Sequence, residues 1–262
     1  MTKAIGIELR TTREIIKIIL PKTQNFEDLA KGDIVIVNIL DSKESGKVVY
    51  IINSRGRSTE GKKILRKANN DDLGKISQIE DEEKRVFNIC LKKIKKHGLS
   101  MKLVGVSISL DGRNLTFYFT AEGRVDFREL LRDLVSTFKK MIRLQQIGPK
   151  DAAKIMGGFG PCGRKVCCTT FLSDMKSITM DLARDQNLEG VTSSKISGLC
   201  GKLMCCLDYE TNIYKELKAN LPKIGDEVRT TKGSGKVIAL NILSQKAIVE
   251  LPDGNKVEKK YS

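Results

Sequence analysis

The sequence contains one histidine and no run of about 18 apolar residues, and both absences exclude functions. Without such a run, no transmembrane helix is predicted. With His97 as the sole histidine, a zinc site of mixed cysteine and histidine ligands is disfavoured, and a cysteine nucleophile lacks its usual base. The sequence also lacks a Gly-x4-Gly-Lys-Ser/Thr phosphate loop and a Gly-x-Ser-x-Gly elbow. We therefore expect a protein without catalytic activity.

Tryptophan is absent and there are only five prolines, yet 40% of the 262 residues are hydrophobic, which is typical of a folded soluble protein. The length suggests one or two domains. Lysine and arginine (47) outnumber aspartate and glutamate (32), giving a net charge of +15. The first ten residues lack the basic and apolar segments of a secretory leader, so we expect a cytoplasmic protein.

The order of predicted elements indicates an α+β fold with three domains. Short Ile- and Val-rich runs predict a β-rich N-terminal segment over residues 1–70. Residues 71–221 form the predicted central domain, a hairpin-plus-helix arrangement with cysteine-rich loops. Its predicted elements are a helix at 71–97, a hairpin at 103–119, a helix at 126–142, a strand at 143–147 and a helix at 179–184. Short strands between glycine turns predict a small SH3-like β-barrel over residues 222–262.

Two features of this chain leave alternatives open. Residues 47–67 hold seven basic side chains and one acid, which predicts either a patch that contacts RNA phosphates or a solvated loop. The run Phe117-Tyr118-Phe119 could stack on bases, but its alternation already explains the phenylalanines as core residues, with Tyr118 facing outward.

The seven cysteines are unevenly spread, and six of them fall within residues 162–206. In a reducing compartment, clustered cysteines bind metals or do redox chemistry more often than they form disulfides. One pattern, Cys-Gly-basic-x-x-Cys-Cys, occurs twice with an offset of 38 residues. Its members are Cys162, Cys167 and Cys168 in the first copy and Cys200, Cys205 and Cys206 in the second. We predict these six as metal ligands and the seventh, Cys90, as a core residue of its helix.

Thiolates are ligands for soft metal centres, and Cys-x4-Cys is a spacing that some iron–sulfur proteins use. A [4Fe–4S] cluster takes four cysteines, so one cluster would leave two thiols over, and two clusters would need two ligands from a partner. The glycines around both copies permit tight turns that bring backbone N–H groups close to cluster sulfurs. We predict one or two [4Fe–4S] clusters. A structural zinc held by cysteines alone, uncoordinated buried thiols and a redox enzyme with vicinal thiols are the alternatives.

Several stretches of the sequence together have a familiar pattern. They are Gly157–Arg164, Cys167–Cys168, Lys195–Gly201, Leu203–Cys206 and Asp111–Glu129. Between about residues 100 and 209 the chain closely resembles the bacterial RicT (YaaT) family, whose C-terminal domain is named after a yeast polymerase-suppressor protein. The barrel-like terminal segment lies outside the resemblance.

The resemblance implies a non-catalytic regulatory iron–sulfur adaptor. Family members associate with two small helical Ric-type partner proteins, carry [4Fe–4S] clusters and influence mRNA processing by the membrane-anchored endoribonuclease RNase Y. The cluster role carries over only to the six cysteines that match. The alternative is a direct RNA-binding protein with a cysteine-ligated structural zinc, which the net charge of +15 and the barrel-like tail favour.

Overall fold

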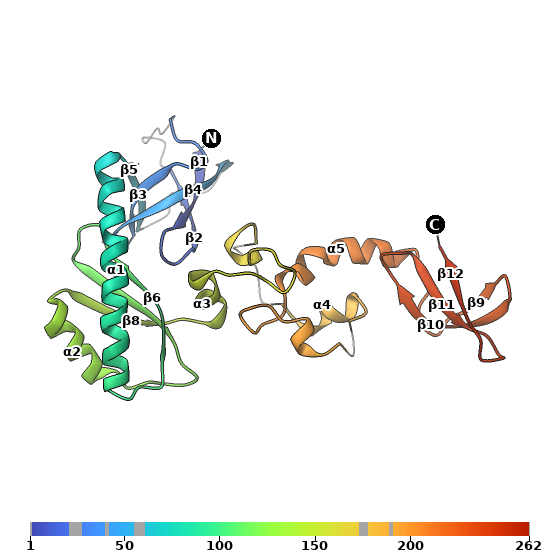
Figure 1. The fold of residues 1–262 in the computed structure, drawn as a ribbon. Coiled ribbons are helices and arrows are strands. Elements are labelled where there is room, and N and C mark those ends of the chain that lie inside the picture. Colours follow the sequence, from blue (N-terminus) through green and yellow to red (C-terminus); the bar gives the residue numbers. More distant parts are fainter. Residues whose placement is uncertain are drawn as a thin grey trace. The chain divides into compact units, whose positions relative to one another are not determined.

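The chain folds as an α+β protein, which confirms the fold class that its order of elements predicts. The computed structural model describes residues 2–20, 28–39, 42–54, 61–172, 178–188 and 191–261. The chain divides into two units, residues 1–174 and residues 175–262 (Figure 1). The domain boundaries expected at residues 70 and 221 stay predictions. None of the described helices is both long enough and apolar enough to span a membrane.

The Ile- and Val-rich runs at the start of the chain form an antiparallel sheet in the order β2-β1-β4-β3-β5. Its strands are β1 (Thr2–Leu9), β2 (Ile15–Ile19), β3 (Ile34–Ile39), β4 (Ser42–Ser54) and β5 (Lys62–Lys67). Alternate residues such as Ile5, Ile7, Val35 and Val37 point into one core, as the period of two requires.

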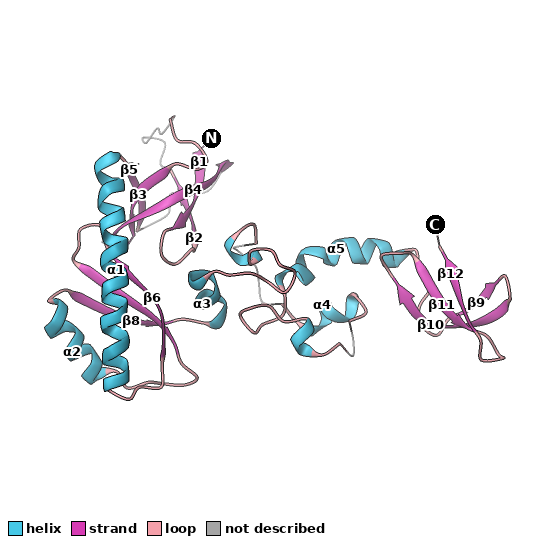
Figure 2. Cartoon of the chain, in the orientation of Figure 1, coloured by secondary structure: helices cyan, strands magenta, loops and turns pink. Residues whose placement is uncertain are grey.

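A second sheet follows in the same unit. Its strands are β6 (Lys102–Ile108), β7 (Asn114–Thr120) and β8 (Met141–Gln146), with β6 and β7 antiparallel and β8 parallel to β7. Helices α1 (Asn70–Lys96) and α2 (Arg128–Phe138) share one apolar core with this sheet, while α3 (Pro149–Met156) contacts β6 and β7. Cys90 is fully buried in that core, which confirms its structural role. Figure 2 shows the strands of this unit in magenta and its helices in cyan.

One ion pair joins the two sheets of this unit. Arg10, just after β1, donates from both terminal guanidinium nitrogens to the carboxylate of Glu83 on α1, at 2.6 and 2.7 Å. Glu83 also accepts the backbone N–H of Ile108, at the end of β6, at 2.8 Å. A backbone hydrogen bond of 2.9 Å, from the Leu110 N–H after β6 to the Lys43 carbonyl on β4, also connects the two sheets. Glu83 therefore ties the helix to both sheets.

The long helix α1 begins at a capping box. The Asn69 side chain accepts the Asp72 N–H, and the Asp72 carboxylate accepts the Asn69 N–H, both at 2.9 Å. The Arg66 guanidinium on β5 pairs with the same carboxylate. At the other end His97 is the C-cap, and its Nε2 lies 3.1 Å from Oδ2 of Asp133 on α2. The only histidine therefore has a structural place.

Replacing Asp72 by asparagine is expected to reduce the loss of stability in acid. Hydrogen bonds from Arg66 and from the Asn69 N–H hold the pKa of Asp72 at about 2, below its ordinary value of 3.8. Because the folded-state pKa is the lower one, the carboxylate stabilises the fold above about pH 4, and this stabilisation is lost as the pH falls toward 2. Asp72→Asn should lower the free energy of unfolding at pH 7 by about 1 kcal/mol.

The measurement is urea unfolding of the parent and Asp72→Asn at pH 7, 4 and 3, with Asp71→Asn as control because Asp71 lies beside Asp72 in the first turn. The parent should lose more stability than Asp72→Asn between pH 4 and pH 3. Parallel losses in the two proteins would contradict the assignment.

Two local expectations are wrong. The helix expected over 126–142 ends at Phe138, where Lys139 takes a left-handed conformation (φ +50°), so Met141 and Ile142 belong to β8 instead. Tyr118 is only 7% exposed rather than facing outward. Thr12, Ile15 and Ile155 line a small cavity with Tyr118, so the β1–β2 turn and α3 cover the second face of the sheet.

The second unit has two small cores. Its elements are α4 (Met180–Asp185), a 3-10 turn η2 (Ser193–Lys195), α5 (Cys205–Ala219), β9 (Glu227–Thr230), β10 (Gly233–Asn241), β11 (Lys246–Glu250) and β12 (Lys256–Lys260). Ala183, Ile196 and Leu207 form the first core, and α4 confirms the helix expected at 179–184.

The strands β9 to β12 form an antiparallel sheet, and the Lys259 ammonium donates to the Arg229 carbonyl across its outer strands at 3.0 Å. The sheet is thus a half-barrel; an SH3-like barrel stays a prediction.

Candidate metal centre

The first cysteine motif forms a tight hairpin directly after α3. Phe159 and Lys165 pair as an antiparallel bridge, and the Gly160 N–H donates to the Arg164 carbonyl at 2.8 Å. The Gly163 N–H donates back to the Gly160 carbonyl at 2.9 Å, which closes the turn that carries Cys162. A 3-10 turn, η1 (Cys167–Thr169), follows the hairpin and contains the adjacent cysteines.

The second motif forms the same hairpin in the other unit. Ser197 and Leu203 make the bridge, and the Gly198 N–H donates to the Lys202 carbonyl at 2.8 Å. The Gly201 N–H donates to the Gly198 carbonyl at 2.9 Å, and Cys205 then begins α5. Each of these bonds lies 38 residues after its counterpart in the first motif. The sequence repeat is therefore also a repeat of backbone structure.

One glycine in each turn is required by its backbone conformation. Gly163 has φ +76° and Gly201 has φ +73°, the left-handed region that glycine adopts at little cost. Each follows the first cysteine of its motif, Cys162 or Cys200. The positive φ lets the chain reverse immediately after that cysteine and bring the Cys-Cys pair back to the base of the hairpin.

Alanine at Gly163 or Gly201 is expected to weaken metal retention. The left-handed conformation costs a residue with a side chain about 1–2 kcal/mol, although no atom outside the adjacent residues lies within 4 Å of the added Cβ at either position. Gly98→Ala is the matched control, since Gly98 has φ +62° and equally open space at the end of α1. The measurement is metal retained after a fixed exposure to chelator. Equal retention in all three variants would contradict a role of the turns in metal binding.

The six motif thiols differ in exposure, and the first thiol of each motif lies beside a glycine. All seven cysteines lie in the described ranges, and none forms a disulfide. Cys162 is exposed and Cys168 is buried, while the other motif cysteines are half-buried. The Cys162 sulfur lies 3.5 Å from the place of a Cβ at Gly160, and the Cys200 sulfur lies 4.0 Å from that of a Cβ at Gly198. In both turns the glycine leaves the space beside the sulfur open.

This donor set fits a soft metal or an iron–sulfur cluster. Thiolates are the ligands that such centres prefer, and Gly160 and Gly198 place no side chain against the turn sulfurs. Arg164, Lys165 and Lys202 are exposed next to the turns. Their positive charges offset the negative charge that gathers when several thiolates ligate one centre. Backbone N–H groups within the turns are already engaged with carbonyls, so the hairpins are preformed.

Three of the predicted ligands belong to the first motif, in one unit, and three to the second motif, in the other, but the structure does not gather the three of either motif into one site. Among the described residues, no three or more His, Cys, Asp or Glu side chains are gathered as a metal site. The sequence had not shown the hairpin behind each motif, although glycine on both sides of the first cysteine in each copy is the signal from which it could have been found.

The basic stretch at 47–67 is divided by the structure. Arg66 pairs with Asp72, and the Lys67 ammonium lies 2.8 Å from the Asp33 carboxylate. Lys62 and Lys63 lie on the edge strand β5. Lys47 lies on β4, while Arg55 and Arg57 fall outside the described residues. An RNA contact through this stretch stays a prediction.

Two family models match the chain. The PSP1 C-terminal conserved region matches residues 62–147, from β5 to just beyond β8. The third domain of PSP1-like proteins matches residues 177–221, which include the second cysteine hairpin and α5. The first hairpin lies between the two matches.

Comparison with known proteins finds relatives in bacteria and yeast. The chain is 46% identical over 226 residues to the stage 0 sporulation protein YaaT of Bacillus subtilis, covering 85% of this chain and 82% of that protein. It is 35% identical over 86 residues to an uncharacterized protein of Schizosaccharomyces pombe, covering 33% of this chain and 12% of that protein. No solved structure matches the chain.

Proposed function

The chain belongs to the YaaT family of PSP1 proteins, and from this premise we propose that it is a non-catalytic regulatory protein with an iron–sulfur centre. Its Bacillus subtilis relative is named for stage 0 of sporulation, and we extend a regulatory role of that kind to this chain. The proposed ligands are the cysteines of the two hairpins, and the proposed place of action is the cytoplasm.

The observation that carries this proposal is the duplicated hairpin. In both copies the first cysteine lies in the same hydrogen-bonded turn, and the adjacent pair of cysteines directly follows the hairpin. A packing role alone does not require the three cysteines and the glycine turn to occur together twice. Cys90, the cysteine that does pack in a core, lies on a helix outside both hairpins.

The number of motif thiols limits which iron–sulfur cluster this chain can ligate. A [4Fe–4S] cluster takes four cysteines and each motif has three, so neither motif alone supplies a full set of ligands. When bound, such a cluster supplies an electron-transfer or redox-sensing centre. The role of the chain is to present thiolates on rigid turns, with basic side chains nearby.

The proposal includes partners. We propose that the chain works with two small helical Ric-type proteins and modulates mRNA processing by RNase Y. Exposed apolar side chains near both hairpins support a protein partner: Phe159 is 67% exposed, Leu199 is 54% exposed and Ile213 on α5 is 53% exposed.

A second candidate is a direct RNA-binding protein with a structural zinc held by cysteines. The net charge of +15 and the exposed lysines of β5 favour it. In this version the C-terminal half-barrel closes as an SH3-like RNA-binding module. Its RNA affinity would fall steeply with salt, because Lys and Arg contacts to phosphate release counterions.

Complementation tests the regulatory proposal. In a strain that lacks the gene, RNase Y-dependent transcript cleavage should be restored by the wild-type chain but not by a chain with serine at all six motif cysteines. Alanine at Cys90 is the control and should restore cleavage. If the six-serine chain restores cleavage fully, the cysteines are not needed for the function. In parallel, salt-sensitive RNA binding by a purified wild-type chain that holds zinc and no iron would favour the second candidate.

A further inference from the structure

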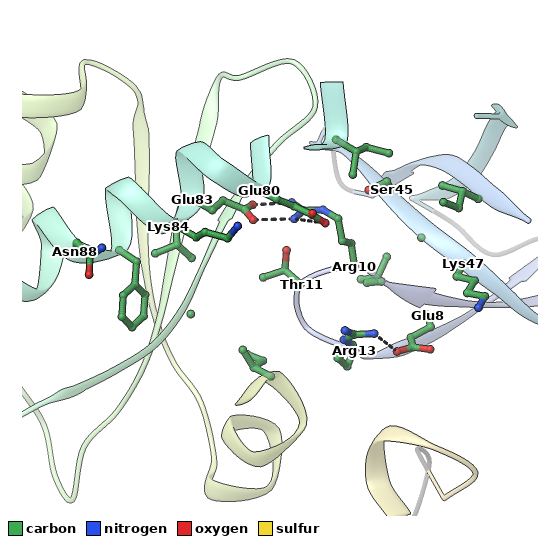
Figure 3. A pocket seen from close by; sticks show the side chains of 18 residues that line it. Glu8, Arg10, Thr11, Arg13, Ser45, Lys47, Glu80, Glu83, Lys84 and Asn88 are labelled. Atoms are coloured by element: carbon green, nitrogen blue, oxygen red, sulfur yellow. Dashed lines mark hydrogen bonds and ion pairs between the residues drawn. The ribbon is translucent and has the colours of Figure 1, made fainter. Parts of the chain in front are cut away.

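A cavity of about 850 Å³ lies within the first unit, between α1 and the N-terminal sheet (Figure 3). One wall is a stripe of α1, and the other comes from β1, the β1–β2 turn, β3 and β4. Residues of β6 and α3 complete the lining. The volume falls within the range of about 300–1,000 Å³ that is typical of small-molecule sites. The cysteine motifs contribute nothing to it.

The acids that line this cavity lie close to arginine side chains. Glu83 holds Arg10 at 2.6 and 2.7 Å, and Glu80 lies 3.8 Å from the same guanidinium. On the β1–β2 side, Glu8 accepts from Arg13 at 3.1 Å. Figure 3 shows both pairs as dashed lines, one beside α1 and the other at the β1–β2 turn. Glu80 and Glu83 share the one Arg10 guanidinium, so the α1 side of the cavity carries one carboxylate more than its cation balances.

One lining cation remains without an acid. Lys84 pairs with Asp81 at 2.9 Å, but the ammonium of Lys47 has no hydrogen-bond or ion-pair partner among the described residues. Lys47 belongs to the basic stretch that the sequence singles out. An anionic group of a ligand would complete its charge pairing.

The rest of the lining suits an apolar body with a polar edge. Ile76, Phe87 and Val106 provide hydrophobic walls, and Ile34 is 37% exposed there. The Asn88 amide also lines the cavity and has no side-chain partner among the described residues. Apolar walls with a few placed polar groups are the usual composition of a site for a small organic molecule.

We propose that this cavity binds a small organic monoanion with a flat apolar body, of the aromatic carboxylate class. At the β1–β4 end of the cavity the exposed Lys47 and Arg13 face one carboxylate, that of Glu8, so one further negative charge fits there. A polyanion would place further charge near Glu80 and Glu83, whose counter-charge is already engaged. The aromatic body would lie against Phe87 and Ile76. This site is independent of the iron–sulfur proposal, because it shares no residue with the hairpins.

Calorimetric titration of the full chain with naphthalene-2-carboxylate tests the proposal. The neutral analogue naphthalene-2-methanol reports the apolar contribution, and citrate reports a polyanion. Naphthalene-2-carboxylate should bind saturably and more tightly than either. Lys47→Met should weaken its binding about 10- to 100-fold, as expected for one hydrogen bond to a charged group, and leave the neutral analogue unchanged. Lys43→Met is the matched control on β4, since Lys43 is exposed but does not line the cavity.

A second pair of variants locates the site without touching the charge. Asn88→Trp adds bulk at the α1 wall and should weaken both naphthalene ligands, whereas Lys92→Trp, one turn further along the exposed face, should leave both unchanged. Thermal midpoints confirm that all variants fold. The proposal is overturned if naphthalene-2-carboxylate does not bind saturably, if Lys47→Met binds it as well as the parent does, if citrate binds more tightly, or if Asn88→Trp has no effect.

Discussion

Serine at both Cys167 and Cys168 is expected to abolish iron binding rather than halve it. The variant leaves four motif thiols, but only Cys162 remains on the first hairpin. Four ligands in the right geometry are needed for one [4Fe–4S] cluster, so the loss of an adjacent pair removes half of a cluster's ligand set. Metal–thiolate binding contributes on the order of 10 kcal/mol to the order of such sites. Cys200, Cys205 and Cys206 should therefore become open to alkylation when the iron is lost.

Iron content and mass-spectrometric mapping of alkylated cysteines measure both effects in one preparation. Cys90→Ala is the control, and it should keep its iron at the cost of some stability. Burial raises the pKa of the Cys90 thiol to about 12, so it should resist alkylation in every folded variant. If the double serine variant keeps half of its iron and its second hairpin stays protected, the hairpins are independent half-sites completed by another protein.

Glutamine at Glu83 is expected to cost about 3 kcal/mol of unfolding free energy. The Glu83 side chain is 11% exposed and the Arg10 side chain 20% exposed, so this pair is largely out of water. Removing one partner of a buried pair leaves an uncompensated charge, which typically costs about 3–5 kcal/mol, and the residual exposure places the effect at the low end. Glutamine can still accept the Ile108 N–H, so the variant isolates the charge.

Glu80→Gln is the matched control. It lies on the same helix, its side chain is 50% exposed, and it reaches Arg10 only at 3.8 Å. Denaturant unfolding should show a loss of less than about 0.5 kcal/mol for this exposed pair. Equal effects of the two glutamines would show that Glu83 does not hold the sheets together.

The elements with strong local signals were predictable from the sequence. Helix α1 was expected at 71–97 and spans Asn70–Lys96, because acidic first-turn residues, a basic last turn and Gly98 mark its ends. The hairpin around Asp111-Gly112 was found from its period of two, and the N-terminal strands from their Ile- and Val-rich runs. The glycines around both cysteine motifs were expected to permit tight turns, and both motifs do form such turns.

Other elements escaped prediction for physical reasons. The apolar stripe of α5 is interrupted by Thr211, which is buried with its hydroxyl donating to the Leu207 carbonyl at 2.7 Å. Helix α3 has eight residues, too few for a clear period, although Pro149 at its first turn is a start signal. Arg10 and Glu83 are 73 positions apart in the sequence, so no local pattern indicates that they pair. The same holds for the cavity around it, whose walls come from separate elements.

The measurement closest to the central claim is the content of iron, acid-labile sulfide and zinc per chain in protein purified without oxygen. We expect brown protein with iron and sulfide in equal amounts, about four of each per cluster. Both should be lost when all six motif cysteines are replaced by serine. Stoichiometric zinc with no iron or sulfide in the wild-type chain would show that the centre is not an iron–sulfur cluster.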